Sequence, residues 1–245
     1  MSPGIRMNRF LASAGLGSRR KCEELIAGGR VRMNGETVTG FATMVDPGED
    51  LVTVDGRTVE MPEKRIVLVL NKPAGILSAA SDDRGRKTVL DIARESGFRS
   101  RVYPVGRLDM DTSGILLLTD DGEFSFRLTH PSYKVEKEYL VTVEGSVCEK
   151  TVERLRSGVK LEDFTTSPCE VEILSVERDR SRLIVRLREG KKRQIRRMFL
   201  ATGHRVKALH RRSVGGISFD DLEPGEMRPL SDAEEKELRR QAGLL

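Results

Sequence analysis

The residues of this chain with the clearest potential for chemistry lie between Gly106 and Asp120. The segment begins Gly-Arg-Leu-Asp-Met-Asp-Thr-Ser-Gly and continues into an apolar run from Ile115 to Leu118. Asp109 therefore comes just before a strand that we expect to be fully buried. A carboxylate at the mouth of a core strand is not freely solvated, so it is either neutralised by a partner or poised to react.

A structural interpretation of the same carboxylate is also open. Asp109 could cap the turn formed by Thr112, Ser113 and Gly114, because aspartate side chains commonly bond to backbone groups two or three residues ahead. The only other acid in this turn is Asp111, which we expect to be an exposed turn residue.

The cations of the chain are concentrated in two segments. Residues 1–32 hold seven Lys or Arg against two acids, and residues 186–212 hold eleven against one. Any single charged run is usually a solvated face. Two such segments, far apart in a chain of net charge +5, favour a polyanionic ligand and therefore nucleic acid.

Several other classes of protein are disfavoured. No apolar run has the length of a membrane span, and arginines interrupt the N-terminal segment, so we expect neither a membrane protein nor secretion. The three cysteines are odd in number and widely spaced, which argues against disulfides and suits a reducing cytoplasm. The histidines lack metal-ligand spacing, so we expect no metal.

Residues 1–61 have the pattern of a small separate domain. Apolar spacing predicts a helix from Met7 to Ala14 and a second helix capped by Ser18. Asn34-Gly35 and Asp55-Gly56 are strong hairpin signals. The cations lie off the apolar face of both helices, so one side of the unit is basic.

This segment resembles the S4-type RNA-binding module. The resemblance lies in Met-Asn-Arg-Phe-Leu-Ala from Met7, Gly-Ser-Arg-Arg from Gly17, Gly-Arg-Val from Gly29, and Asn34-Gly35. It implies that the start of the second helix docks on RNA phosphates, where cations add to exposed amides. The alternative is a solvated helix hairpin. The implied RNA-binding residues are Arg9, Ser18, Arg19, Arg20 and Lys21.

A polar linker at 61–64 leads into a second domain at 65–245. We expect strands at 66–70, 115–118, 139–143, 171–176 and 183–187, and a turn at 71–75. We expect helices at 88–94, 123–128, 148–157, 192–202 and 233–242, two of them opened by capping boxes. Strands outnumber helices and the order is mixed, which predicts an α+β domain with a mostly antiparallel sheet.

The segment from Gly106 to Asp120 is similar, position by position, to the signature of the RsuA-type pseudouridine synthases. The resemblance implies that Asp109 is the indispensable catalytic residue and that Arg107 enters the RNA helix where the target uridine leaves it. It also implies that Tyr139 stacks on the flipped uracil. Lys72-Pro73 resembles the first motif of the family, whose expected role is to shape a loop beside the site.

A third motif, Gln-Ile-Arg at 194–196, completes the resemblance. In the family, the basic residue of this motif forms a salt bridge with the catalytic aspartate. The resemblance therefore implies a salt bridge between Arg196 and Asp109. We expect the surrounding cations to contact RNA phosphates rather than to react. These cations are Lys191, Lys192, Arg193, Arg197, Arg211 and Arg212.

The implied reaction explains the need for a carboxylate. Uridine becomes pseudouridine when the bond from the sugar to N1 of uracil breaks and the same base rejoins through C5. A carboxylate can attack the base, attack C1′ or remove the C2′ proton. The sequence does not distinguish among these three routes. The reaction itself requires no redox step, metal or cofactor.

The order of an S4 module followed by a Gly-Arg-Leu-Asp synthase core is typical of the RsuA/RluB/RluE/RluF group. We therefore expect a cytoplasmic, monomeric and cofactor-free enzyme that modifies one uridine of large-subunit (23S) ribosomal RNA, either naked or in an assembling particle. Two alternatives stay open. One is an RsuA-like target in small-subunit (16S) RNA, and the other is a non-catalytic RNA-binding factor for ribosome assembly.

Overall fold

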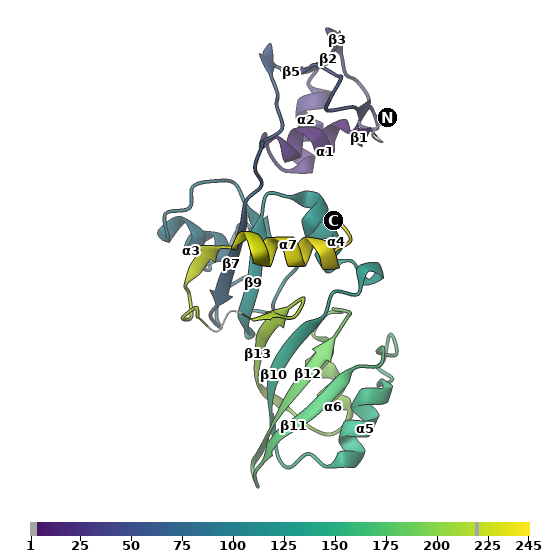
Figure 1. Cartoon of the computed structure of the whole chain (residues 1–245), viewed down its shortest axis with the longest axis vertical. Helices are drawn as coiled ribbons and strands as arrows, with labels where there is room; N and C mark the ends of the chain where they lie inside the picture. Colours follow the sequence, from purple (N-terminus) through teal and green to yellow (C-terminus); the bar gives the residue numbers. More distant parts are fainter. Residues whose placement is uncertain (1–3, 219–220) are drawn as a thin grey trace. The chain divides into compact units, whose positions relative to one another are not determined.

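The computed structural model describes residues 4–218 and 221–245 and divides the chain into two compact units (Figure 1). The first unit runs to Arg65 and includes Asp120–Gly122, and the second holds Ile66–Thr119 and Glu123–Leu245. Each unit buries a core of its own. No helix within the described residues is both long enough and apolar enough to span a membrane.

The first unit contains two short helices beside small sheets. Its elements are β1 (Ile5–Arg6), α1 (Met7–Ser13), α2 (Arg19–Ala27), β2 (Val31–Met33), β3 (Glu36–Thr37), β4 (Met44–Val45), β5 (Val52–Val54) and β6 (Arg57–Thr58). The strands pair in the order β3-β2-β5-β6, with β1 and β4 as a separate pair. Asn34 and Asp55 both have φ near +50° and each is followed by a glycine at positive φ, as two-residue hairpins require.

The core of this unit is formed by the apolar faces of the two helices. Met7 and Leu11 of α1 pack with Cys22 and Ile26 of α2, and all four are buried. The Ser18 side chain accepts a hydrogen bond from the Lys21 backbone N–H at 3.2 Å, which confirms the predicted cap.

The second unit is organised around one large, mostly antiparallel sheet. Its strands are β7 (Val67–Lys72), β8 (Tyr103–Pro104), β9 (Ser113–Thr119), β10 (Lys137–Glu144), β11 (Glu170–Val176), β12 (Arg180–Leu187), β13 (Val206–Val214), β14 (Ile217–Ser218) and β15 (Met227–Pro229). Its helices are α3 (Val89–Glu95), α4 (Gly122–Thr129), the short 3-10 helix η1 (Pro131–Tyr133), α5 (Glu149–Ser157), α6 (Gln194–Ala201) and α7 (Asp232–Gln241). The sheet order is β11-β12-β10-β13-β9-β7-β15. The predicted α+β class with a mostly antiparallel sheet is confirmed, although β13 pairs with β9 in parallel.

Strands β7 and β9 are covered on both faces, which explains why their sequences are continuously apolar. On one face, Val69 and Leu117 pack with residues of α4 and α7. On the other, Leu70 and Leu116 pack with residues of α3. Figure 1 shows α7 lying across these two strands. The strand that follows Asp109 is therefore anchored in the core.

The other half of the sheet buries one face against two helices. Val141 and Val143 of β10 and Val185 of β12 pack with Leu155 of α5 and Met198 of α6. The two halves meet where β13 lies between β10 and β9. This junction brings the third sequence motif, which precedes β13, toward the segment that precedes β9.

The structure corrects three details of the predicted elements. Strand β13 was not predicted, because its cations hide the apolar alternation. Strand β7 continues through Asn71 and Lys72, which we expected in a turn. Helix α6 begins at Gln194 rather than at 192, because Arg193 has left-handed backbone geometry with φ +50°.

Candidate active site

The candidate catalytic residue, Asp109, lies on a loop between Gly106 and Gly114, two positions whose backbone conformation favours glycine. Gly106 and Gly114 have φ of +69° and +107°, a region that disfavours side chains. A Cβ on Gly114 would come 2.2 Å from the backbone oxygen of Arg211 on β13. The loop is therefore held against the β13 backbone at the start of β9.

The buried side chain of Lys72 holds the loop of Asp109 in place through hydrogen bonds. Lys72, at the end of β7, has no exposed surface, and its Nζ donates to the carbonyl oxygens of Pro73 at 3.0 Å and Thr112 at 2.8 Å. It also lies 3.5 Å from the carbonyl oxygen of Met110. Burial lowers the pKa of Lys72 to about 8, against the opposing charges of Asp111 and Asp109. The expectation that Lys72 shapes the neighbouring loop agrees with these contacts.

Ser78 fixes the loop on the side that precedes Asp109. Its Oγ donates to the carbonyl oxygen of Leu108 at 2.9 Å, and the Leu108 N–H lies 3.1 Å from the same Oγ. Leu108 itself is buried against α3. The residue directly before Asp109 is thus fixed by both packing and hydrogen bonds.

The carboxylate of Asp109 takes no part in the turn. The turn is closed by backbone atoms alone, with the Thr112 N–H donating to the Asp109 carbonyl oxygen at 3.0 Å. The side chain of Asp109 is 33% exposed, and its one polar contact within the described residues is with Arg193, whose Nη1 lies 3.5 Å from Oδ2. The capping interpretation is therefore wrong for the side chain, and the carboxylate is available for chemistry.

The predicted salt bridge between Arg196 and Asp109 is not present, and the structure assigns different partners. The Nη2 of Arg196 lies 3.2 Å from Oδ2 of Asp111 and 3.0 Å from the Asp111 carbonyl oxygen. Its Nη1 donates to the carbonyl oxygen of Val206 at 3.3 Å. Arg196 lies three residues after Arg193 and contacts Asp111 and the Thr112 hydroxyl, at 3.5 Å, instead of Asp109. Arg193, at the helix start, is the residue that faces Asp109.

Asp111 is exposed as expected, but it is also part of this ionic network. Arg193 donates to both of its carboxylate oxygens, at 3.3 and 3.4 Å. Burial works to raise the pKa of Asp111, but the hydrogen bond from Arg193 and the charges of Arg196 and Arg193 outweigh it, so the pKa lies below its ordinary value. Arg193 therefore bridges the two acids of the loop.

Asp109 opens into a cavity of about 430 Å³, a size typical of ligand sites. Its walls include Arg107, Tyr139 and Arg193. Tyr139 is the third residue of β10 and packs against the cores of both halves of the sheet. The structure thus brings the predicted catalytic residue, the predicted stacking ring and the predicted intruding arginine to one cavity.

The third motif is held in place by Gln194, a buried residue that sequence reasoning did not single out. Its Oε1 accepts from the Lys191 N–H at 3.1 Å, and its Nε2 donates to the Glu189 carboxylate. Glu189 also accepts from the Ser167 N–H at 2.9 Å. The loop at 189–193 is therefore fixed beside the cavity. The presence of Gln194 in the Gln-Ile-Arg motif is the sequence feature that could have predicted this role.

The other predicted RNA-binding residues of this unit differ in their surroundings. Arg107 and Lys192 are exposed and make no side-chain hydrogen bond or ion pair within the part of the chain that the structure describes. Lys191 lies over the ring of Phe164, with its Nζ 3.7 Å from the centroid. Arg197 forms an ion pair with Asp163.

Two further cations were expected on phosphate, and the structure contradicts this for Arg211, whereas for Arg212 it stays a prediction. Arg211 is only 6% exposed, and its Nε donates to the Ile115 carbonyl oxygen at 2.7 Å. Arg212 lies 3.5 Å from the Glu138 carboxylate. Both residues lie on the unpredicted strand β13, where pairing with the sheet fixes their directions. Arg211 is a buried structural cation rather than a surface contact.

In the first unit, the predicted RNA-binding residues at the start of α2 are exposed. They are Ser18, Arg19, Arg20 and Lys21, whereas Arg9 on α1 is partly buried. Within the described residues of the whole chain, no group of three or more His, Cys, Asp or Glu side chains has the arrangement of a metal site.

Comparison with known proteins identifies this architecture. Residues 66–201 match the family model of RNA pseudouridylate synthases, and residues 5–51 match that of the S4 domain. The ribosomal large subunit pseudouridine synthase B of Bacillus subtilis (strain 168) is 42% identical over 96% of this chain and 95% of that protein. An uncharacterized RNA pseudouridine synthase of Aquifex aeolicus is also 42% identical, over 98% of this chain and 96% of its own. A crystal structure of a pseudouridylate synthase superposes with a TM-score of 0.68 at 33% identity, covering 96% of this chain and 99% of that one.

The chain belongs to the RNA pseudouridylate synthase family and carries an S4 domain ahead of the synthase domain. It is an enzyme, a pseudouridine synthase that acts on RNA.

Proposed function

We propose that this enzyme converts one uridine of large-subunit ribosomal RNA to pseudouridine, and that Asp109 begins the reaction. The observation that carries the proposal is the availability of the Asp109 carboxylate, which faces a cavity and is not used by the turn on which it lies. Its neighbour Arg193 keeps a positive charge within 3.5 Å. A charged, positioned carboxylate is what each of the three routes, attack on the base, attack at C1′ or removal of the C2′ proton, requires.

Tyr139 and Arg107 receive the extruded nucleotide in this proposal. Tyr139 supplies an aromatic face on which the flipped uracil stacks, at a wall of the Asp109 cavity. Arg107 is exposed at the same cavity and has no partner in the described residues, so its guanidinium is available to fill the gap that the uridine leaves. Filling that gap offsets part of the few kcal/mol that unstacking costs.

The remaining cations hold RNA phosphates. Lys191, Lys192, Arg193 and Arg197 surround the third motif beside the cavity, and contacts from such residues position the nucleic acid without reading its sequence. At the start of α2, Arg19, Arg20 and Lys21 add positive charge to the amides that Ser18 leaves exposed, and Arg9 lies on α1. We assign RNA docking to residues 1–61 and catalysis to residues 65–245.

The choice of large-subunit RNA is supported by the Bacillus subtilis relative, a ribosomal large subunit pseudouridine synthase whose similarity extends over nearly the whole of both chains. The enzyme acts as a monomer in the cytoplasm, on naked RNA or on an assembling ribosomal particle. It needs no cofactor, because the reaction moves one bond within one nucleotide and changes no oxidation state.

The test is to expose both ribosomal RNAs, taken from cells that lack the gene, to the purified protein. Pseudouridine is then measured by liquid chromatography of the nucleosides and mapped by position. New pseudouridine at one site of the large-subunit RNA supports the proposal. Pseudouridine in the small-subunit RNA instead would identify the RsuA-like alternative and overturn the proposed target, with the chemistry kept.

A further inference from the structure

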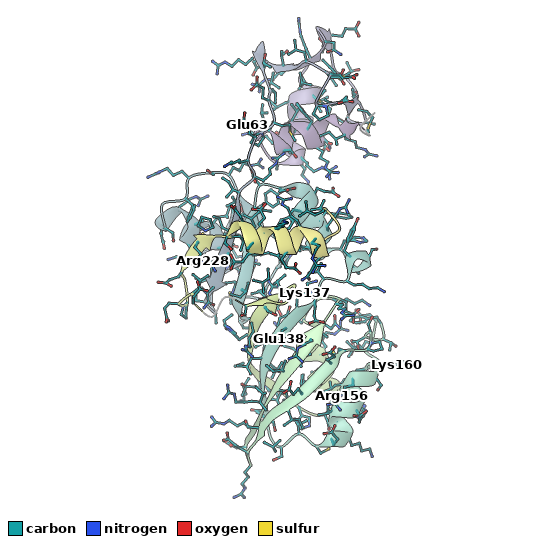
Figure 2. The ribbon with its side chains drawn as sticks, viewed as in Figure 1. Glu63, Lys137, Glu138, Arg156, Lys160 and Arg228 are labelled. Atoms are coloured by element: carbon teal, nitrogen blue, oxygen red, sulfur yellow. The ribbon has the colours of Figure 1, made fainter. Side chains whose placement is uncertain are left out.

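Lys137 is a charged side chain beside the cavity of Asp109 to which the proposed function gives no role. Lys137 is the first residue of β10 and lies two positions before Tyr139, so both side chains are on the same face of the strand. The regular register with β12 confirms this placement, because Lys137 is opposite Leu187 and Tyr139 is opposite Val185, two positions apart. Figure 2 labels Lys137 and its neighbour Glu138 at the start of this strand.

The ammonium of Lys137 is partly buried and makes no hydrogen bond or ion pair with any described residue. The next residue, Glu138, points to the opposite face and is neutralised by Arg186 at 2.7 Å. Burial, and then the nearby charge of Arg211, lowers the pKa of Lys137 to about 8. A cation taken out of water without a partner costs stability, so the fold gains nothing from it.

Lys137 lines a small cavity of about 100 Å³ that we call the side chamber, bounded also by Arg107, Tyr139, Glu189 and Arg211. The side chamber shares Arg107, Tyr139 and Glu189 with the cavity of Asp109, so the two are adjoining. Its remaining walls are largely apolar, formed by Val105, Leu117, Leu128 and Val214.

The chemistry of these walls suits the edge of a nucleobase better than a phosphate. Apolar side chains accept a flat ring, and the unpaired ammonium of Lys137 matches one carbonyl oxygen. Of the two other cations in the walls, Arg211 already donates to the Ile115 carbonyl oxygen, and Arg107 is assigned to the gap that the uridine leaves. A phosphate would have to lose its water among aliphatic side chains and next to the Glu189 carboxylate. The cations for phosphates lie outside, exposed at the third motif.

We propose that Lys137 binds a carbonyl oxygen of the target uracil and stabilises the negative charge that the base acquires during the reaction. The inference rests on the proposed role of Asp109. When the N1–C1′ bond breaks after attack at C1′ or loss of the C2′ proton, its electron pair passes to the uracil ring and its oxygens. When the carboxylate adds to the base, the displaced π electrons reach the same oxygens.

Lys137 keeps its proton throughout. The base then rejoins C1′ through C5, the C5 proton is lost, and N1 gains a proton, so no external reagent is consumed. A donor that is positioned where charge develops in a water-poor site typically contributes about 10²–10³-fold to turnover. Lys137 would also keep hold of the detached base while it turns.

The test compares Lys137→Met with Lys150→Met, a change at an exposed lysine of α5, on an RNA that the unaltered enzyme converts. We expect Lys137→Met to lose about 10²–10³-fold in single-turnover rate, with RNA affinity and its salt dependence unchanged. The melting temperature should be unchanged or higher, because an unpaired buried charge has been removed. Lys150→Met should behave as the parent protein.

Other outcomes would overturn the inference. Full turnover by Lys137→Met would show that the ammonium does not act on the base. A loss explained by weaker binding and a salt slope shallower by about 1 would identify a phosphate contact. Conversion of small-subunit RNA alone would refute the proposed target only, and the same comparison on that RNA, with full turnover by Lys137→Met, would overturn the role of Lys137.

A second measurement does not depend on turnover. The rate at which an acylating reagent modifies Lys137 is followed by mass spectrometry, with no RNA, with RNA carrying the target uridine, and with RNA abasic at that position. Protection by the uridine RNA and not by the abasic RNA is expected. Equal protection by both RNAs, or by neither, would contradict binding to uracil.

Discussion

The ammonium of Lys72 lies 2.8 Å from the carbonyl oxygen of Thr112, a residue 40 positions further along the chain. This contact joins the end of β7 to the loop that carries Asp109. Because Lys72 is fully buried, the loop is held by a charge-assisted hydrogen bond that water does not reach. The position of the Asp109 carboxylate, to which we assign catalysis, thus depends on a residue that need not touch the substrate.

Replacing Lys72 by Met should therefore weaken both the fold and the reaction. The carbonyl oxygens of Pro73 and Thr112 lose their donor, which should lower the free energy of unfolding by about 1–3 kcal/mol. The turnover number should fall by about 10–100-fold, since small displacements of a reacting group are costly. Urea unfolding and single-turnover kinetics measure the two effects. Lys87→Met, at a surface lysine, is the control, and equal behaviour of both variants would refute the role given to Lys72.

Replacing Arg193 should mainly lower turnover, whereas replacing Arg196 should mainly lower stability. Arg193→Gln removes the charge that faces Asp109 from an exposed position, so turnover should fall by about tenfold or more while the free energy of unfolding changes by less than about 0.5 kcal/mol. Arg196 is 11% exposed and bonds to backbone oxygens, so Arg196→Gln should cost about 1–3 kcal/mol of stability. Full turnover in Arg193→Gln would remove the support for its pairing with Asp109.

The S4 domain should contribute to RNA affinity through its charge. Changing Arg19 and Arg20 together to Ala should weaken binding and make the slope of log K against log salt shallower by about 1–2, because fewer counterions are released. Filter binding over a range of salt concentrations measures this slope. Lys150→Ala with Arg154→Ala on α5 is the matched control. An unaltered slope in the Arg19/Arg20 variant would contradict docking at the start of α2.

Glu234 gives a pH dependence with a definite sign. Hydrogen bonds from Arg228, which outweigh burial, lower its pKa from an ordinary 4.5 to about 2. The folded state therefore binds the proton less readily than the unfolded state, and the stabilisation is complete above pH 4.5 and lost as the pH falls toward 2. Glu234→Gln should cost on the order of 1–2 kcal/mol at pH 7, and this difference should shrink between pH 4.5 and 3. A difference that is constant over urea titrations from pH 7 to 3 would contradict the assignment.

Local features of the fold could be predicted from the sequence because their partners are close in the chain. The capping boxes of Thr88 with Asp91 and of Ser231 with Glu234 are both present, as is the cap at Ser18. The apolar run before Thr119 was correctly expected to be buried, since a strand covered on both faces has no polar alternation.

The relationships that depend on long-range pairing could not be predicted. Strand β13 carries cations at Lys207, Arg211 and Arg212, which resembles a surface segment until its neighbours in the sheet are known. Arg211 is buried because β13 lies between β10 and β9. That Arg193 rather than Arg196 faces Asp109 likewise depends on where α6 begins. The left-handed backbone conformation of Arg193 determines this start.

The most direct measurement is the single-turnover rate of Asp109→Asn on an RNA that the unaltered protein converts, with Asp111→Asn as the control. Asparagine keeps the size of the side chain and removes its charge and basicity. The account predicts a folded variant that binds RNA with parental affinity and forms no measurable pseudouridine, while Asp111→Asn keeps measurable turnover. Turnover at the parental rate in Asp109→Asn would contradict it.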